Sequence, residues 1–548
     1  MNQGEALALN YGPNLRVKLI RYWRGLTLVL LLLMVFVGNV IFGAVGVRGS
    51  DQYWYVGDLW MSKLTGRPVT NAIYPTATVL NSDHLVGGLP PRIHNLPITY
   101  LASLVHQAGA TGYFAWVYVN VSVALVIAVT VYLVAKWQGY SYAYIAPAVF
   151  LSFPLTVWLS MNALVEMSLA LGSCLLMVGA TIISRAGKSN EGRVPIGLLV
   201  VAAGSVLMFY TRDNYILLFP AQAIFTFWVC RLHRKRWVLA GPILGLTALF
   251  AALKYVLFPQ YPTAGLLSLL MSGTSSNKEK MAAYYDLGHV PFSISELILK
   301  AIVGVKDALL PSGPVELITE LPIIVIVIAA LVLLRKNEGS RPLLFWMAVV
   351  AAIYLATSAV FQAQNRYIFA LVPFAAVFGV GLVDRFLSHG TARGVLANTL
   401  KVGTASFLLV GIFGSFLMAR TYRAEATTAV AQTSKLSAGL ADEPGGPVLA
   451  SVETSKLLPL TYAAIPRPVL AVNPKINSAT AAAKLIETWG VRVVVGSTNE
   501  DLQYFSRAVG LALGGRAKLV RQSSHETPGG PVEIWLIRQE SQESAVER

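Results

Sequence analysis

Charged side chains stand where the long apolar runs of this sequence begin or end. Asp51 follows the first run, Glu166 lies near the start of another, Arg212 closes a third and Arg366 precedes a fourth. A charge beside a bilayer is costly unless it is paired or used. Arginine binds phosphate oxygens through two parallel N–H groups, and a carboxylate can take a proton from a hydroxyl or an amine. The pattern therefore predicts a site for an anionic headgroup beside a carboxylate base.

These residue types favour sugar transfer from a lipid phosphate over hydrolysis or nucleotide chemistry. Such a transfer needs cations that hold the phosphate and a base that activates the acceptor, but no strong acid, because phosphate departs as a stabilised anion. The sequence contains no Ser–His–Asp spacing, no P-loop and no zinc signature. His84 and His94 with Asp83 lack the tight spacing of metal ligands. We expect no cofactor, and spacing gives a divalent metal no support.

Five further residues are candidates for substrate contact: Tyr367, Asp58, His94, Lys278 and Lys280. The two lysines lie in a loop where they could hold phosphate or gate entry, and Asp58 is helically spaced from Asp51. Each candidate also has a structural interpretation. Tyr367 could be an interfacial aromatic, His94 a packing residue beside Pro97, and the remaining three could be solvated charges.

The four main residues have structural interpretations as well. Asp51 could cap a helix beside the membrane, and Glu166 could simply be buried against a neighbouring cation. Arg212 could pair with Asp213, and Arg366 could be an anchor that reaches toward the headgroups. The order of the apolar runs places all four residues at one membrane face. This convergence favours the functional interpretation over four independent structural roles.

The composition requires membrane-spanning helices to position these side chains. Of the 548 residues, 55% are hydrophobic and only 13% are charged, about half the charged fraction of a soluble domain. A spanning helix needs about 20 apolar residues. Eleven candidate spans meet this need, near residues 25–47, 115–135, 141–158, 162–184, 195–211, 214–230, 237–257, 317–334, 342–361, 367–384 and 397–418. Amphipathic stretches within 258–316 leave thirteen spans as the alternative.

The basic residues predict how the chain is oriented. Arg16, Lys18, Arg21 and Arg24 precede the first span, and every later short loop that is strongly basic falls on the same side. Basic loops stay in the cytoplasm, so we expect a multi-pass protein of the inner or plasma membrane with a cytoplasmic N-terminus. This bias accounts for the net charge of +16 without nucleic acid. The first run is too long for a signal peptide and is interpreted as a retained span.

The chain divides into a membrane part and a polar C-terminal part. We predict a transmembrane domain over residues 1–418, with large outer loops at 48–115 and 258–316. Residues 419–548 alternate short valine-rich runs with alanine- and leucine-rich stretches, which is typical of a small α/β domain. The strands are expected at Val448–Val452, Val469–Val472, Val491–Val495 and Val532–Ile537. The orientation places this domain outside the cytoplasm.

The order of these features resembles the GT-C superfamily of membrane glycosyltransferases, especially protein O-mannosyltransferases and bacterial aminoarabinose transferases. The likeness covers about residues 1–420 and rests on five elements: Asp51-Gln52-Tyr53-Trp54-Tyr55, His94-Asn95-Leu96-Pro97, Ala163-Leu164-Val165-Glu166, Arg212-Asp213-Asn214, and Asn365-Arg366-Tyr367 followed by Pro373. Many relatives have a second acidic residue directly after the aspartate, whereas this chain has Gln52. That departure weakens the case for a metal or a second carboxylate there.

The resemblance implies inverting transfer of a sugar from a polyprenyl-phosphate donor to a lipid, glycan or protein acceptor. Asp51 matches the catalytic aspartate of the first outer loop and would be the general base. Two other functions remain open at this stage: a transporter or flippase for a lipid-linked glycan, and a non-catalytic subunit of envelope glycan assembly. A transporter needs charged or broken helices at the membrane midplane, whereas most charges here lie near one face.

Overall fold

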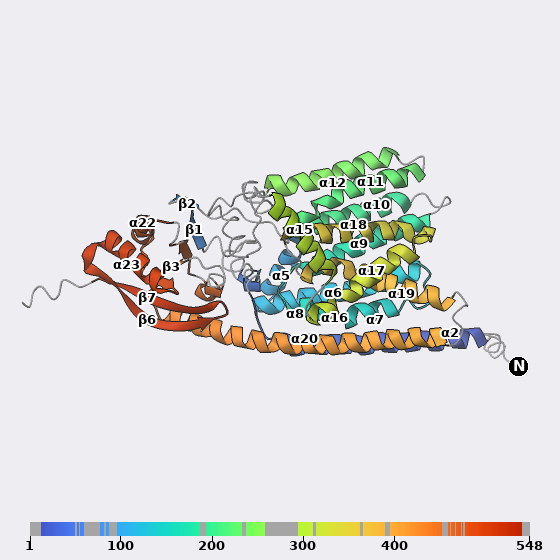
Figure 1. The fold of residues 1–548 in the computed structure, drawn as a ribbon, viewed down its shortest axis with the longest axis horizontal. Helices are drawn as coiled ribbons and strands as arrows, with labels where there is room; N and C mark the ends of the chain where they lie inside the picture. Colours follow the sequence, from blue (N-terminus) through green and yellow to red (C-terminus); the bar gives the residue numbers. More distant parts are fainter. Residues whose placement is uncertain are drawn as a thin grey trace, which may run out of the picture.

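A computed structural model describes most of the chain and shows a helical bundle joined to a mixed domain (Figure 1). The described residues are 13–49, 52, 53, 55–57, 59, 77–81, 84–86, 96–186, 193–232, 237–257, 294–310, 314–361, 365–388, 395–451, 459, 460, 462–465, 467–472, 474 and 477–539. The bundle contains the apolar helices, and the mixed domain contains the β-sheet. One long helix runs along the bundle and continues to the sheet.

Seven helices within the described ranges are long and apolar enough to cross a membrane. They coincide with seven of the eleven predicted spans, and the chain is an integral multi-pass membrane protein. These helices are α2 (Pro13–Gly43), α6 (Gly112–Trp137), α9 (Glu166–Ala186), α10 (Arg193–Thr211), α18 (Arg341–Phe361), α19 (Val372–Ser388) and α20 (Val395–Ala441). The 3₁₀ helices η2 (Glu338–Ser340) and η3 (Asn365–Leu371) precede α18 and α19.

The other four predicted spans correspond to an interrupted helix, to the shorter helices α11 (Leu218–Leu232) and α17 (Leu321–Leu333), and to α12 (Trp237–Leu257), whose apolar part is Ala240–Leu253. Residues 141–158 do not form the single helix that we predicted, because α7 (Ile145–Ser152) ends and α8 (Pro154–Met161) begins at Pro154. Proline lacks an N–H group and disfavours helical backbone in the preceding residue, and Phe153 is accordingly extended with ψ 124°. The 3₁₀ helix η1 (Asp213–Leu217) directly precedes α11.

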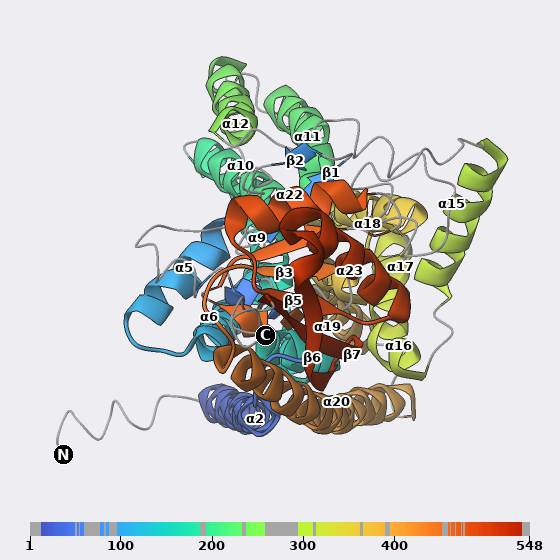
Figure 2. The ribbon, with the colours of Figure 1, turned by 90° about the vertical axis from the view of Figure 1, so that its left-hand side faces the viewer.

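Three more helices lie in regions predicted to be outer loops. They are α5 (Leu96–Gln107), α15 (Ile294–Leu309) and α16 (Pro314–Thr319). Helix α15 matches the amphipathic stretch predicted near residues 294–310 and packs on α18, where the backbone of Ser358 leaves no room for a side chain at Gly304. Figure 2 shows α15 and α12 at the periphery of the bundle.

Helices α9 and α10 are in unusually close contact. A Cβ atom added to Gly172 would lie 3.2 Å from the carbonyl oxygen of Gly204, and one added to Gly179 would lie 2.6 Å from that of Gly197. Glycine is therefore the residue type that allows these backbones to approach. Because the two helices are consecutive and antiparallel, this packing brings the start of α9 beside the end of α10.

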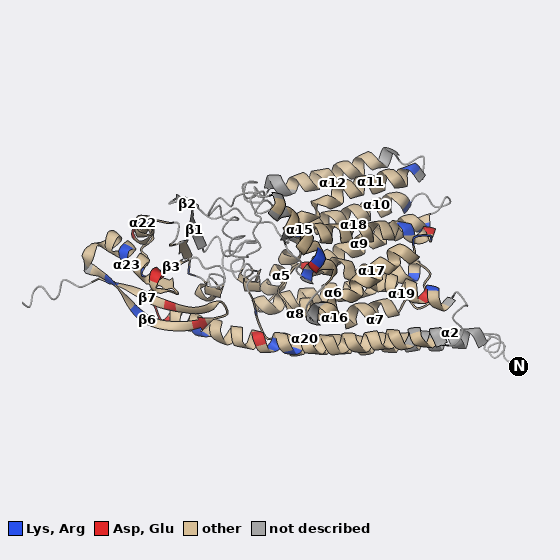
Figure 3. Cartoon of the chain, viewed as in Figure 1, with Lys and Arg blue, Asp and Glu red and all other residues tan. Residues whose placement is uncertain are grey.

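Several basic residues lie together at the end of the bundle farther from the sheet (Figure 3). Lys136, Arg185, Arg231 and Arg385 each stand in the last turn of a helix. Hydrogen bonds join these helix ends, since Gln138 donates to Thr181 over 3.4 Å and Ser141 donates to Asp384 over 3.2 Å. We call this the basic end of the bundle. The end nearer the sheet contains a separate group of charges.

Helix α20 connects the membrane bundle to the sheet. It pairs with α2 along the side of the bundle (Figure 2), where Phe42 and Phe416 stack with ring centroids 6.0 Å apart. The predicted domain boundary at residue 418 falls inside this helix, which continues to Ala441. The stretch after residue 418 contains no proline and its first glycine is Gly439, so nothing local ends the helix at the membrane surface.

The mixed domain has a seven-stranded sheet with the order β2-β1-β4-β3-β5-β7-β6. The strands are β1 (Ala77–Asn81), β2 (His84–Val86), β3 (Val448–Ser451), β4 (Val469–Val472), β5 (Val493–Gly496), β6 (Ala517–Thr527) and β7 (Gly530–Gln539). Strands β1, β4, β3 and β5 are parallel, and the others pair antiparallel. Strand β1 belongs to the loop after α2, so the first outer loop contributes to the C-terminal sheet.

Helices cover both faces of the sheet. Alternate strand residues point to opposite faces: Leu449 packs with the helices α22 (Ala479–Trp489) and α23 (Asn499–Leu513), whereas Val448 packs with the end of α20. Leu436 and Leu440 are the α20 residues in the second layer. The membrane helix α20 is therefore part of the core of the mixed domain.

Candidate functional site

Glu166 begins α9 at the end of the bundle nearer the sheet, after a short turn over residues 162–165. Asn120 of α6 fixes this turn. Its fully buried side-chain amide lies within hydrogen-bond distance of three carbonyl oxygens, those of Leu159 (3.3 Å), Asn162 (2.7 Å) and Leu164 (3.2 Å). An acidic residue in the first helical turn is favoured by the helix dipole. The turn thus places a carboxylate at a defined point inside the bundle.

Two arginines from other elements converge on this carboxylate. Arg212 follows α10 in extended conformation, and its Nη2 donates to Glu166 Oε1 over 2.7 Å. Arg366 lies at the start of η3, and its Nε is 3.5 Å from the same oxygen. The Glu166 side chain is 0% exposed, and the two arginines are 17% and 14% exposed. Such a buried group has low dielectric surroundings that strengthen its interactions.

Tyr367 supports both guanidinium groups with its aromatic ring. The ring centroid lies 5.5 Å from the guanidinium carbon of Arg212 and 5.5 Å from that of Arg366. Cations at this distance are attracted by the negative face of the ring. A further bond fixes the segment after Arg212, because Asn214 donates to Thr357 of α18 over 2.7 Å. We call Glu166, Arg212, Arg366 and Tyr367 the arginine cluster.

The arginine cluster has more positive than negative charge and is not fully hydrogen-bonded. Within these four described residues two guanidinium groups face one carboxylate, so the four together carry a net charge of +1. Oε2 of Glu166 and Nε of Arg212 are buried and have no hydrogen-bond partner among the described residues. Buried polar atoms are nearly always satisfied, and each exception needs an explanation. An anionic ligand that accepts from arginine would supply both the missing charge and a missing acceptor.

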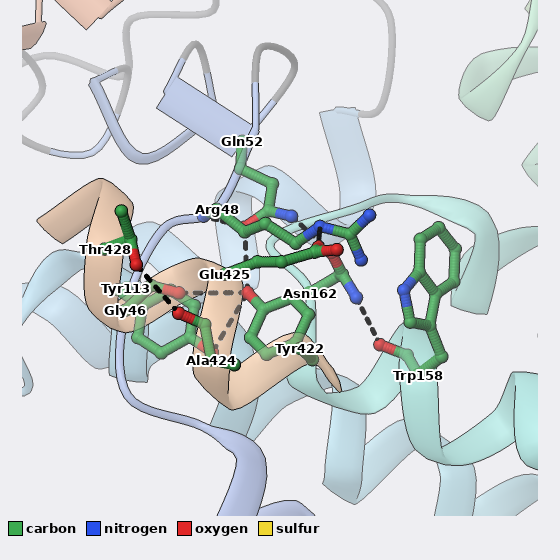
Figure 4. Close-up of polar contacts among 10 residues, drawn as sticks. All are labelled: Gly46, Arg48, Gln52, Tyr113, Trp158, Asn162, Tyr422, Ala424, Glu425 and Thr428. Carbon is green, nitrogen blue, oxygen red and sulfur yellow. Dashed lines mark hydrogen bonds and ion pairs between the residues drawn. The ribbon is translucent and has the colours of Figure 1, made fainter. Parts of the chain in front are cut away.

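A second buried polar group lies where the first outer loop meets α20 (Figure 4). Gln52 donates through its amide to Asn162, and its carbonyl oxygen accepts from the Tyr422 hydroxyl over 3.0 Å and from the Arg48 backbone over 3.2 Å. The Tyr422 hydroxyl also lies 2.9 Å from the carbonyl oxygen of Gly46. Tyr113 completes the group, with its hydroxyl 3.3 Å from that of Tyr422 and 2.6 Å from the carbonyl oxygen of Met161.

We call Gln52, Asn162, Tyr422 and Tyr113 the neutral network. Its side chains come from the first outer loop, the turn before α9, α20 and α6. Two contacts extend the attachment to α20: an ion pair joins Arg48 to Glu425, and the hydroxyls of Tyr53 and Thr433 are 3.0 Å apart. The network therefore fixes the start of the first outer loop, one residue after Asp51 in the sequence, against the bundle and against α20.

The structure brings together four of the residues that the sequence predicted for the site. Glu166, Arg212, Arg366 and Tyr367 form one cluster, and Arg212 pairs with Glu166. The other five predicted site residues lie outside the described residues: Asp51, Asp58, His94, Lys278 and Lys280. Their proposed roles stay predictions.

Sequence reasoning missed Tyr422, Tyr113 and Asn120. Asn120 is a polar side chain in an otherwise apolar span, and this is the signal that could have drawn attention to it. The tyrosines carried no comparable signal, because aromatic residues near span ends are common in membrane proteins.

Comparison with solved structures identifies proteins that have a similar fold. No family model matches the sequence, and no curated protein matches it. Among solved structures, ArnT from Cupriavidus metallidurans bound to undecaprenyl phosphate is similar over 93% of this chain and 97% of its own, with a TM-score of 0.57 and 13% identity. The oligosaccharyltransferase AglB from Archaeoglobus fulgidus, in complex with an inhibitory peptide and a dolichol-phosphate, is similar over 95% of this chain and 74% of its own, with a TM-score of 0.53 and 13% identity.

This chain has the GT-C fold. ArnT and AglB both belong to that superfamily of lipid-phosphate-sugar glycosyltransferases, and the resemblance drawn from the sequence is confirmed at the level of the fold. The likeness extends over the bundle and the mixed domain together, since more than nine-tenths of this chain is covered. Because the identities are low, the fold alone follows from this comparison. What the arginine cluster does has to be argued from its own chemistry.

Proposed function

We propose that this chain transfers a sugar from a polyprenyl-phosphate donor to a lipid, glycan or protein acceptor. The observation that carries the proposal is the convergence of two guanidinium groups on one buried carboxylate, in a group of four residues with a net charge of +1. The GT-C fold supports it, because ArnT is bound to undecaprenyl phosphate and AglB to a dolichol-phosphate in their structures. The donor's phosphate would occupy the space beside Arg212 and Arg366.

The charge of the arginine cluster suits the change that the donor undergoes. The phosphate of a sugar-linked polyprenyl phosphate has one negative charge, and it gains a second when its oxygen separates from the sugar C1 atom. Arginines that bind the departing phosphate therefore stabilise the transition state more than the bound donor, which is the requirement for catalysis. Glu166 would be a positioning residue that orients both guanidinium groups toward this phosphate.

The acceptor needs a base, and we propose Asp51 for this role. The carboxylate would take the proton of the acceptor hydroxyl or amine while the acceptor atom attacks C1 from the face opposite the phosphate. The new bond forms as the C1–oxygen bond breaks, so the configuration at C1 inverts and polyprenyl phosphate departs. Gln52 is buried and bonded at both ends of its amide, and it follows Asp51 directly in the sequence. This anchor would limit the movement of the loop during the reaction.

The proposed orientation has the C-terminal domain outside the cytoplasm. The last turns of α6, α9, α11 and α19, each of which contains a basic residue, lie at the end of the bundle away from the sheet (Figure 3), and basic residues favour the cytoplasmic side. The arginine cluster lies toward the other end. A lipid donor presented at the outer leaflet of the inner or plasma membrane would then reach the site. The proposal keeps eleven membrane-crossing segments, one of which consists of α7 and α8 together.

The test is sugar transfer by the purified chain in lipid nanodiscs that contain a polyprenyl-phosphate sugar and candidate acceptors. We expect Asp51→Asn to lower the rate by about 10²–10⁴-fold, the usual contribution of a general base. The matched control is Asp442→Asn, which removes an exposed carboxylate from the region after α20.

Equal transfer by Asp51→Asn and the wild type would remove Asp51 from the mechanism. Movement of the sugar lipid across the bilayer without product would instead favour a flippase. If the wild type transfers no sugar from a panel of such donors, the enzyme proposal fails.

A further inference from the structure

A groove at the basic end of the bundle combines two arginines with an apolar floor. It has a volume of about 370 Å³ and lies between α11, α17 and α18. Its lining residues are Ile224, Trp228, Leu331, Arg335, Arg341, Leu344 and Phe345. This groove is far along the bundle from the arginine cluster, because Arg335 follows the last turn of α17 and Arg341 begins α18 at the end that faces away from the sheet (Figure 3).

The lining changes from charged to apolar in the same direction along α17 and α18, whereas α11 contributes only apolar residues. Leu331 lies one helical turn before Arg335, and Phe345 lies one turn after Arg341. On α11, Ile224 lies one turn deeper than Trp228, since this helix ends at the basic end with Leu232. Four helical residues span about 6 Å. A ligand in the groove would therefore meet guanidinium groups at the membrane surface and hydrocarbon immediately below.

Aromatic packing gives the groove a fixed floor. Phe225 stacks on Phe345 with centroids 5.4 Å apart, and Trp228 is 6.5 Å from Phe345 and 5.7 Å from Phe225. Phe225 and its neighbour Trp346 are fully buried. Ile224, in contrast, is 62% exposed. A rigid floor does not have to be ordered when a ligand binds, which lowers the entropic cost of binding.

Neither Arg335 nor Arg341 forms a strong ion pair with the described part of the protein. Arg341 is 52% exposed and reaches Glu338 only at 3.6 Å, and Glu338 is itself 85% exposed; such surface pairs contribute little. Within the described part of the chain, Arg335 forms no ion pair. Two cations over an apolar groove match an amphiphile with an anionic head, and basic pockets between membrane helices are known to bind such lipids.

We infer that this groove binds an anionic glycerophospholipid of the surrounding bilayer. The phosphate would lie between Arg335 and Arg341, and one acyl chain would extend along Trp228, Phe345 and Ile224. This inference does not depend on the proposed sugar transfer, because it concerns a different end of the bundle and different residues. Its consequence is that the membrane composition stabilises the α11–α17–α18 region.

The test uses native mass spectrometry of the purified full chain, titrated with phosphatidylglycerol or phosphatidylcholine of the same acyl length. We expect the wild type to bind phosphatidylglycerol more tightly, and the double variant Arg335→Ala/Arg341→Ala to lose about 10–30-fold of this affinity, from about 1 kcal/mol per basic residue. The matched control is Arg185→Ala/Arg193→Ala, which removes two exposed arginines at the same end, one from the last turn of α9 and one from the start of α10.

A second variant and a soluble competitor separate the remaining outcomes. Ile224→Ser should weaken binding of the lipid while leaving the arginines in place, and soluble glycerol phosphate should not compete, because it has no acyl chain. Equal affinity for the two lipids, or an equal loss in the control variant, would overturn the inference. Competition by glycerol phosphate would show a simple anion site and would equally reject a lipid groove.

Discussion

The arginine cluster and the neutral network are two buried polar groups in the same half of the bundle, and they differ in how completely their atoms are bonded. In the neutral network, Gln52 uses both ends of its amide and the Tyr422 hydroxyl has three neighbours within hydrogen-bond distance. In the arginine cluster, one carboxylate oxygen and one guanidinium nitrogen are buried without a partner in the described residues. Asn162 and Glu166 are only four positions apart in the sequence, so the two groups share the turn before α9.

This difference separates a structural role from a ligand-binding role. A buried polar network that is fully satisfied makes the fold rigid and specific, whereas one that is partly satisfied carries a free-energy cost. A protein keeps such a cost when a ligand removes it in the working state. We therefore expect substitutions in the arginine cluster to affect turnover first, and substitutions in the neutral network to affect stability first.

The largest effect is expected from removal of a guanidinium group. Arg366→Ala and Arg212→Ala should each lower the rate of transfer by about 10²–10³-fold, comparable with the loss of one donor that stabilises a developing negative charge. Arg366→Lys should retain part of the rate, because the charge stays while the two-pronged geometry is lost. The measurement is kcat and KM for the donor in nanodiscs.

The exposed Arg420 of α20 supplies the control for these variants. Arg420→Ala removes the same charge from the surface and should leave kcat within about twofold, since an exposed cation contributes little. If Arg366→Ala behaved like Arg420→Ala, the arginine cluster would have no part in turnover, and its similarity to a phosphate site would be incidental.

The next largest effect is expected from substitution of Glu166, where the loss of stability and its recovery on ligand binding can be measured separately. Glu166→Gln removes the charge of the carboxylate that both largely buried guanidinium groups contact, which should destabilise the protein by about 3–5 kcal/mol. A bound polyprenyl phosphate would replace the missing negative charge. We therefore expect its addition to raise the Tm of Glu166→Gln more than that of the wild type, as measured by thermal unfolding in detergent.

A lipid without phosphate serves as the control for Glu166→Gln. A polyprenol of the same chain length should raise both melting temperatures equally, because it has the apolar tail and lacks the anion. An equal response of the variant to polyprenol and polyprenyl phosphate would contradict an anion site at the cluster.

The neutral network should respond in the opposite way. Tyr422→Phe leaves the ring in place and removes the hydroxyl that bonds Gln52 and Gly46, which should lower stability by about 1–3 kcal/mol for the unsatisfied partners. The kcat of the folded fraction should stay within about threefold of the wild type, since the network contributes no charge to the site. Thermal unfolding and kcat measured on the same preparation distinguish the two outcomes. A large loss of kcat at unchanged Tm would mean that the network acts directly in the reaction.

Sequence reasoning reached the charged group more readily than the neutral one, for a physical reason. Charged side chains in apolar runs are rare and costly, so Glu166, Arg212 and Arg366 stand out, and their spans place them at one face. Gln52 and Tyr422 are 370 positions apart and are ordinary residues for a membrane interface. Only the packing of α20 against the first outer loop brings them together, and no local pattern encodes that packing.

The sheet also shows that local sequence patterns do not predict contacts between distant segments. The four valine-rich runs lie where β3, β4, β5 and β7 are found. The signal is clearest for β3, β4 and β5, because buried central strands are short and almost entirely apolar. Strand β6 has an alternating, largely polar sequence with many exposed residues, and it was missed. The pairing of β1 with β4 joins residues 77–79 to residues 469–471, and such a distant pairing has no signature in either segment.

The smallest expected effect tests how Tyr367 acts. Its ring lies at 5.5 Å from both guanidinium carbons, so the ring face should contribute more than the hydroxyl. A cation–π contact contributes about 0.5–2 kcal/mol, and Tyr367→Leu should therefore reduce kcat/KM by about 3–30-fold. Tyr367→Phe keeps the ring and should remain within about twofold of the wild type. Steady-state transfer with the same donor measures both variants.

The pair of Tyr367 variants also shows whether the hydroxyl or the aromatic ring of this residue acts in the site. If Tyr367→Phe lost as much kcat/KM as Tyr367→Leu, the hydroxyl would be the active group, and the tyrosine would bind the donor or acceptor by hydrogen bonding. If only the leucine variant is slow, the ring holds the guanidinium groups in place, and the arginines alone face the phosphate. The second result is the one that a preorganised anion site requires, because rigid donors stabilise a developing charge without reorganising during the reaction.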